Sequence, residues 1–230
     1  MNNFFIAAPF GNYIKPKGCI PVAGTFTLNA RGNRFLAVAK TLRYNSAQGG
    51  WVNKLGLPNP GIRNGLEKNP TVISIAEIDK GDFQRLNVLI PENQSIELNL
   101  SCPNLDKKLS WESAKCFTPN TRKWCIAKMS PLTTPEEIKF VVEHLGITQL
   151  HFSNTLPTIR GGLSGPMLRG YTTELIELAR SEYGDSVEII AGGGVSDFPA
   201  VYDYMSAGAN HVALGSVCFN WFKMRKLLEK

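Results

Sequence analysis

The feature that most constrains the fold is a series of short apolar runs that recurs along the chain, separated by helical or turn-rich segments. Several runs, such as residues 187–191, are apolar on nearly successive positions instead of alternating. This pattern is typical of strands buried on both faces, as in a parallel sheet covered by helices. We expect strands at residues 20–25, 35–39, 71–76, 95–100, 124–129, 149–153, 187–191 and 211–214.

Helical segments lie between several of these runs. Residues 134–145 begin with Thr134 as a candidate N-cap, followed by a proline and two acidic residues that suit the first helical turn. Residues 172–183 carry apolar side chains at helical spacing, and Asp197 is placed to cap a further helix. Strands that alternate with helices predict an α/β fold, either a (β/α)8 TIM barrel or an open doubly wound sheet.

The length of the chain favours the barrel in a compact form. Its 230 residues fit one domain, spanning 1–230, but lie near the lower end for this fold, which usually needs about 250 residues. Only residues 26–34 separate the first two expected strands, which is too short for a crossover helix with its loops. We therefore expect an abbreviated barrel with shortened loops and a reduced first crossover.

Charge and cysteine usage narrow the function classes. The net charge of +6 would suit nucleic acid, a phosphate-bearing cofactor or an acidic substrate. The basic residues are scattered without interleaved aromatics, which favours a solvated surface over a nucleic-acid groove. The five cysteines form no C-x-x-C pair and the three histidines have no metal-ligand spacing. We expect reduced thiols, no metal site, no signal peptide or membrane span, and a cytoplasmic protein.

Glycine-rich segments follow the last three expected strands, at residues 161–166, 191–195 and 215–216. Glycine lets backbone N–H groups approach a phosphate closely. Turns after the seventh and eighth strands are the usual phosphate site of (β/α)8 barrels. We therefore expect a phosphate site here, although tight turns alone would also need glycine.

Polar side chains follow other expected strands. Asn99 and Asn104 flank Cys102; the two amides could orient a planar imide or pyrimidine, and the thiol could accept a proton if its surroundings lower its pKa. By itself, a cysteine at a strand end is more often a packing residue. Lys40 and Lys128 continue two strands and suggest an anionic ligand or an anionic reduced cofactor, with an ordinary surface position as the alternative.

The run Ile-Glu-Leu-Asn-Leu-Ser-Cys-Pro-Asn at residues 96–104 resembles the hallmark motif of dihydroorotate dehydrogenases. Further segments resemble this family in its own order across nearly the whole chain, at residues 21–26, 39–41, 53–61, 128–131, 154–156, 161–166, 193–194 and 215–216. A cysteine base is the pattern of the soluble class 1. Within class 1, the segments at residues 128–131, 154–156 and 161–166 are similar to those of the subtype that works with an iron–sulfur flavoprotein subunit and passes electrons to NAD.

The resemblance implies FMN-dependent oxidation of (S)-dihydroorotate to orotate, a step of pyrimidine biosynthesis. Cys102 would remove the C5 proton while hydride passes from C6 to FMN N5, with Lys40 near flavin and substrate and Lys128 stabilising the charge of the reduced flavin. The implied substrate-binding residues are Asn53, Leu55, Gly56, Leu57, Asn99, Asn104, Asn154 and Thr155. The implied FMN-binding residues are Ala23, Gly24, Lys40, Thr41, Asn99, Lys128, Ser153, Gly165, Gly193, Gly194, Gly215 and Ser216. A homodimer is also implied, with an iron–sulfur flavoprotein partner in the NAD-linked subtype.

The sequence departs from the family pattern in its loops. Residues 44–50 replace the Gly-Asn-Pro-x-Pro-Arg segment, and only residues 157–160 stand where the family has a long stretch before the glycine turn. Glu77 stands where the third strand of the family usually ends in glycine. Two alternatives therefore remain: a related FMN oxidoreductase acting on another dihydropyrimidine or an enoate-like substrate, and a degenerate barrel that binds flavin or phosphate without catalysis.

Overall fold

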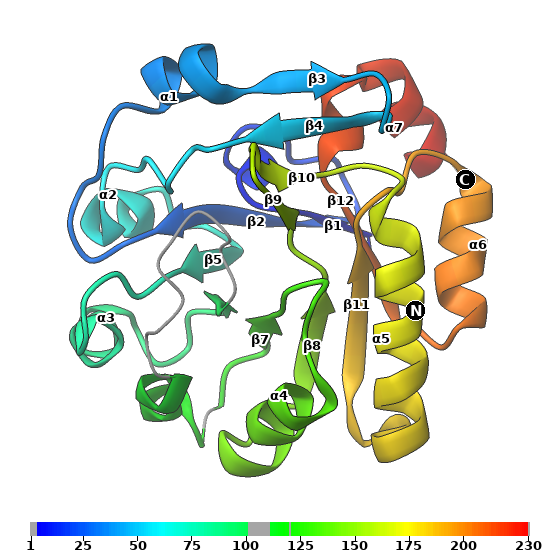
Figure 1. Cartoon of the computed structure of the whole chain (residues 1–230). Coiled ribbons are helices and arrows are strands. Elements are labelled where there is room, and N and C mark those ends of the chain that lie inside the picture. The colour runs from blue at the N-terminus through cyan, green and yellow to red at the C-terminus, as the bar shows by residue number, and fades with distance from the viewer. Residues whose placement is uncertain (1–3, 101–110, 120, 230) are drawn as a thin grey trace.

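The computed structural model, which describes residues 4–100, 111–119 and 121–229, contains a closed barrel of parallel strands (Figure 1). The barrel strands are β1 (Phe4–Ile6), β2 (Cys19–Phe26), β5 (Val72–Ile75), β6 (Ile96–Asn99), β7 (Cys125–Lys128), β8 (Gln149–Phe152), β11 (Glu188–Gly192) and β12 (His211–Leu214). Each strand pairs with its neighbour in this order, and β12 pairs with β1 to close the barrel. The predicted (β/α)8 architecture is confirmed.

Helices surround the barrel on its outer side (Figure 1). They are α2 (Ile62–Glu67), α3 (Asp82–Leu89), α4 (Pro135–Lys139), α5 (Leu168–Tyr183), α6 (Phe198–Ser206) and α7 (Trp221–Leu228), with the 3₁₀ segments η1 (Phe10–Asn12), η2 (Trp111–Phe117), η4 (Gly184–Ser186) and η5 (Ser216–Phe219). A π-helical segment, η3 (Phe140–His144), continues α4. Both predicted N-caps are confirmed, because the side chains of Thr134 and Asp197 accept hydrogen bonds from the backbone N–H groups of Glu137 and Ala200. No helix within the described ranges is long and apolar enough to cross a bilayer.

The strands bury their two faces differently. One face packs with the surrounding helices in the main apolar core, which includes Ile73, Leu98 and Leu150. The alternate residues form a smaller apolar cluster around Phe5 and Trp124, whose rings meet edge to face at 5.1 Å. Period-two alternation along each strand then brings polar residues into the layer nearer the carboxyl ends. The apolar cluster therefore forms the base on which a polar layer rests.

One predicted strand is wrong. Residues 35–39 belong to helix α1 (Arg34–Thr41), in which no residue is buried and whose N-cap Asn33 accepts a hydrogen bond from Leu36 N. The remaining barrel strand is β1 instead, so the expected first strand at residues 20–25 is in fact the second. A reduced first crossover does occur, but between β1 and β2, where the described chain forms only η1.

A small separate sheet lies beside α1, apart from the barrel wall (Figure 1). Its strands are β3 (Arg43–Asn45), β4 (Gly50–Asn53), β10 (Gly161–Leu163) and β9 (Leu156–Thr158), in that order. Gly161, expected in a phosphate turn, instead begins β10, and a Cβ on it would lie 2.1 Å from the Asn53 carbonyl oxygen. Gly161 is thus required by strand packing.

Candidate active site

A cavity of about 320 Å³ opens at the carboxyl ends of the barrel strands, and it is called here the large cavity to distinguish it from a side cavity of about 160 Å³. Segments that follow β1, β8, β11 and β12 form part of its wall, including Ala8, Ser153, Gly193 and Gly215. Helix α1 and the small sheet complete the wall through residues such as Trp51. The cavity therefore lies where active sites of (β/α)8 barrels are found.

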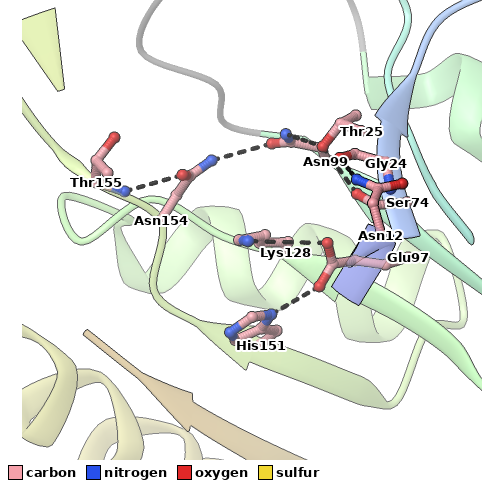
Figure 2. Close-up of polar contacts among 10 residues, drawn as sticks. All are labelled: Asn12, Gly24, Thr25, Ser74, Glu97, Asn99, Lys128, His151, Asn154 and Thr155. Carbon is pink, nitrogen blue, oxygen red and sulfur yellow. Dashed lines mark hydrogen bonds and ion pairs between the residues drawn. The ribbon is translucent and has the colours of Figure 1, made fainter. Parts of the chain in front are cut away.

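A second cavity of about 160 Å³, the side cavity, shares part of its wall with the large one. A chain of hydrogen bonds crosses its lining (Figure 2). Asn154 Nδ2 donates to Asn99 Oδ1 at 3.1 Å, Asn99 Nδ2 donates to Thr25 Oγ1 at 3.2 Å, and Thr155 N donates to Asn154 Oδ1 at 2.9 Å. Amides held in this way present fixed donors and acceptors, which suits a planar amide or imide.

Asn12 of η1 supports the same wall through Gly24 of β2 (Figure 2). Its Nδ2 donates to the Gly24 carbonyl at 3.0 Å and its Oδ1 accepts from Gly24 N at 3.2 Å, so both backbone polar groups of Gly24 are satisfied by one side chain. The hydroxyls of Thr25 and Ser74 are hydrogen-bonded at 3.0 Å. Gly24 and Thr25 are therefore held in place by hydrogen bonds with Asn12 and Ser74, and this fixes the Thr25 hydroxyl that accepts from Asn99.

Three ionisable side chains are buried next to one another (Figure 2), and two of them, Lys128 and His151, line the large cavity. Glu97 Oε1 lies 3.8 Å from Lys128 Nζ, and Glu97 Oε2 lies 2.8 Å from His151 Nδ1. Burial acts to raise the pKa of Glu97, but the charge of Lys128 and the hydrogen bond with His151 outweigh it and lower that pKa to about 2. Burial, and then the charge of Lys128, lower the pKa of His151.

These directions fix the proton positions in the group. An ionised carboxylate can only accept hydrogen bonds, so the neutral His151 must carry its proton on Nδ1 and donate to Glu97. The Nε2 atom of His151 is then a hydrogen-bond acceptor, and His151 is one of the residues that line the large cavity. Lys128 lines both cavities, and its positive charge is balanced by a carboxylate that lines neither.

A rim pocket adjoins the large cavity and includes Gly165, Gly194, Ser216 and Lys223 in its wall. No acidic side chain occurs among its described lining residues, and one lysine does. Arg169 Nε donates to the Gly194 carbonyl at 2.9 Å and so holds the glycine turn in place. Glycine turns in the wall of a pocket together with a lysine fit a phosphate group, so the residues present suit a cofactor that carries one.

Most of the predicted site residues meet in these three spaces. Those that line at least one of them are Gly24, Asn53, Leu55, Leu57, Asn99, Lys128, Ser153, Asn154, Thr155, Gly165, Gly193, Gly194, Gly215 and Ser216. Ala23 is buried in the wall of β2, and Gly56 lines none of the three spaces. Cys102 and Asn104 lie outside the described residues.

Lys40 and Thr41 are placed differently from the prediction. Both belong to α1 instead of a strand end, and neither lines any of the three spaces. Lys40 is exposed, and the Thr41 hydroxyl donates to the Ala37 carbonyl within the helix. The expected position of Lys40 beside the cofactor and substrate is therefore corrected. Arg34 of the same helix lines both the large and the side cavity instead.

Sequence reasoning did not single out Asn12, Arg34, Glu97 and His151. For Glu97 a signal was available, since an acid inside an apolar strand requires a partner within the barrel. His151 offered the same signal in β8. Asn12 and Arg34 carried no comparable signal, because their roles depend on how the first crossover and α1 fold over the barrel mouth.

The fold and the site together define a (β/α)8-barrel protein with a glycine-lined pocket that suits a phosphate group, together with a cavity lined by fixed amides. A sequence model of the dihydroorotate dehydrogenase family matches residues 22–229, and the chain belongs to this family. Members of the family are FMN-dependent oxidoreductases, which confirms the predicted enzyme class and its cofactor.

Individual relatives and structures agree with this assignment. The chain is 28% identical over 201 residues to the dihydroorotate dehydrogenase B (NAD(+)) catalytic subunit of Endomicrobium trichonymphae, covering 73% of this chain and 65% of that protein. It is 27% identical over 256 residues to the subunit of the same name from Staphylococcus carnosus, covering 87% and 82%. The crystal structure of DHODH from Eimeria tenella in complex with ferulenol shares the fold, with a TM-score of 0.76, 19% identity, and coverage of 94% of this chain and 76% of that one.

Gly194→Ala tests the rim pocket. Gly194 has a φ of 68°, and a Cβ on it would lie 2.9 Å from Arg169 Cγ and 3.0 Å from the Gly165 carbonyl oxygen. Displacing this turn removes about one charge-assisted hydrogen bond to phosphate, so we expect FMN affinity to fall roughly tenfold to a hundredfold. Fluorescence titration of FMN measures this.

Gly170→Ala is the matched control for that variant. Gly170 lies in α5, and a Cβ on it meets no atom within 4 Å. Alanine is favoured over glycine within a helix by about 0.5–1 kcal/mol, so this variant should gain stability and keep the FMN affinity of the wild type. Equal loss of FMN in both variants would contradict the assignment of the rim pocket.

Proposed function

We propose that the protein oxidises dihydroorotate to orotate with FMN in the large cavity and the pyrimidine in the side cavity. The observation that carries this proposal is the shared wall of the two cavities, to which Lys128 and Asn154 contribute. Because several residues line both cavities, ligands bound in them would lie next to each other, as direct hydride transfer requires. When bound, FMN supplies the hydride acceptor, at N5.

The side chains around the side cavity position the substrate. Asn99 and Asn154 are already hydrogen-bonded to each other, so their remaining donors and acceptors point in fixed directions toward a pyrimidine amide. Lys128 is held by Glu97, and its positive charge favours negative charge developing on the neighbouring ligands. Asn53, Leu55 and Thr155 complete the binding surface in this proposal, while Lys40 has no part in it.

Cys102 is proposed as the base that takes the C5 proton. The four cysteines of the described ranges are poor candidates, because burial raises the pKa of Cys116 and Cys125 to about 11 and of Cys218 to about 12, and also raises that of Cys19. Cys102 follows Asn99 by three residues, and three residues span at most about 11 Å. It is therefore the thiol that sequence distance ties to the side cavity.

The assembly and the compartment are proposed on more general grounds. The relatives named above are catalytic subunits of dihydroorotate dehydrogenase B (NAD(+)), which supports an iron–sulfur flavoprotein partner that passes electrons to NAD. Trp221 and Phe222 of α7 are 55% and 85% exposed and support a protein contact such as a homodimer. Cys19, Cys116, Cys125 and Cys218 form no disulfide, in keeping with the cytoplasm.

Anaerobic mixing with dihydroorotate tests the proposed activity. The FMN-loaded protein should lose its visible flavin absorption, and orotate should form in an equal amount. If dihydroorotate leaves the flavin oxidised but another dihydropyrimidine reduces it, that other compound is the substrate. Purified protein that takes up no FMN would contradict the proposal as a whole.

A further inference from the structure

Helix α1 presents one row of side chains to the cavities. Arg34, Val38 and Leu42 line the large cavity, and Arg34 and Val38 also line the side cavity. Arg34 and Val38, four residues apart, lie on one face of α1, and Leu42 directly follows the last residue of the helix. Arg34 thus brings a guanidinium to the wall that the two cavities share, close to where the sequence predicted the ammonium of Lys40.

Among the described residues that line the two cavities with Arg34, no side chain is acidic. Residues 1–66 include eight lysines and arginines and not one aspartate or glutamate. The other cation in these described linings, Lys128, is paired with Glu97. No carboxylate among the described residues forms an ion pair with Arg34, so an anion from solution would meet an uncompensated positive charge.

The guanidinium is nevertheless held in place. Its Nε donates to the Pro58 carbonyl at 3.3 Å, its Nη1 donates to the Tyr13 hydroxyl at 3.0 Å, and its Cζ lies 5.9 Å from the Tyr13 ring centroid. No hydrogen bond from Nη2 occurs within the described ranges. An arginine fixed by neutral partners, with donors to spare, is prepared to bind a planar anion at little further entropic cost.

We propose that Arg34 binds the carboxylate of the ligand in the side cavity and so selects carboxylated pyrimidines over neutral ones. This inference rests on the proposed function for the identity of the substrate. Asn99 and Asn154 line the same cavity, so the ring amides and the carboxylate of one ligand have separate partners. Arginine binds carboxylates through paired N–H donors, which gives direction as well as charge.

Calorimetric titration of FMN-loaded protein with orotate tests the inference without turnover. Arg34→Gln should weaken orotate binding about tenfold to a hundredfold, as expected for loss of a charge-assisted hydrogen bond, and Arg34→Lys should retain part of the affinity. Uracil lacks the carboxylate and should bind the wild type and Arg34→Gln equally weakly. Orotate affinity should fall with added salt in the wild type and less steeply in Arg34→Gln.

Arg43→Gln is the matched control. Arg43 follows α1, is exposed, and its Nη1 donates only to the Ala39 and Leu42 carbonyls, so this variant removes one positive charge away from the cavities. Orotate affinity should stay at the wild-type value. In steady state, Arg34→Gln should raise the KM for dihydroorotate with little change in kcat, since the contact is made equally in ground and transition states.

The outcomes separate this inference from the proposed activity. Equal orotate affinity in wild type and Arg34→Gln overturns it, even if dihydroorotate reduces the wild-type flavin. Equal weakening of orotate and uracil in Arg34→Gln also overturns it, because a general loss of cavity structure would then be the cause. Failure of the wild type to bind orotate overturns it as well. Arg34-dependent orotate binding without flavin reduction would uphold the carboxylate site and refute the dehydrogenase activity.

Discussion

Cys102→Ala is expected to slow the reduction of bound FMN by dihydroorotate by about 10²–10⁴-fold, the range typical for loss of a positioned general base. In the proposed reaction, removal of the C5 proton accompanies hydride loss from C6. The described cysteines Cys116, Cys125 and Cys218 are poor bases for this step, because burial keeps their thiols protonated at neutral pH. Anaerobic stopped-flow measurement of the flavin absorption gives the rate directly. FMN content should remain that of the wild type.

Two further cysteine variants sharpen this result. In Cys102→Ser the bound flavin should be reduced slowly at neutral pH, because a serine hydroxyl gives up its proton far less readily than a thiol. The rate of flavin reduction in this variant should increase at high pH. Cys19→Ala removes a half-buried thiol at the start of β2, at the end of the barrel opposite the cavities, and should leave the rate unchanged. Wild-type reduction rates in Cys102→Ala would show that another group takes the proton.

Much of the barrel could be predicted because its strands are buried on both faces. Seven of the expected runs lie in barrel strands, and such strands appear in sequence as nearly continuous apolar segments. Residues 35–39 are equally apolar, yet they belong to a helix in which Phe35 is 81% exposed. An apolar run at these positions therefore does not indicate a buried strand. β1 has only three residues, too few for a recognisable pattern.

The site was predictable where strand ends alone determine position. Asn99, Lys128 and Asn154 follow barrel strands directly, and the carboxyl ends of parallel strands converge. Asn12 reaches the site through an irregular crossover, and Arg34 reaches it through a helix over the barrel mouth. Their positions depend on tertiary packing that local sequence does not specify. Lys40 was predicted at a strand end for the same reason, whereas residues 34–41 form a helix on which Lys40 is exposed.

Glu97→Gln is expected to lower the free energy of unfolding at pH 7 by about 3–5 kcal/mol, the usual cost of removing one partner of a buried ion pair. Glu97 is fully buried, and the substitution keeps its size while leaving the buried Lys128 without its counter-charge. Urea titration of the FMN-free protein measures the change without a contribution from cofactor binding.

Glu188→Gln is the control, and pH separates the two variants. Glu188 also pairs with a histidine, His211, at 2.7 Å, but its side chain is 37% exposed, so its loss should cost no more than about 1 kcal/mol. Because the pKa of Glu97 falls on folding from about 4.5 to about 2, its stabilising contribution is complete above pH 4.5 and is lost as the pH drops toward 2. The difference between wild type and Glu97→Gln should therefore shrink only below pH 4.5, and a difference that disappears already at pH 6 would show that the carboxylate is not the stabilising charge.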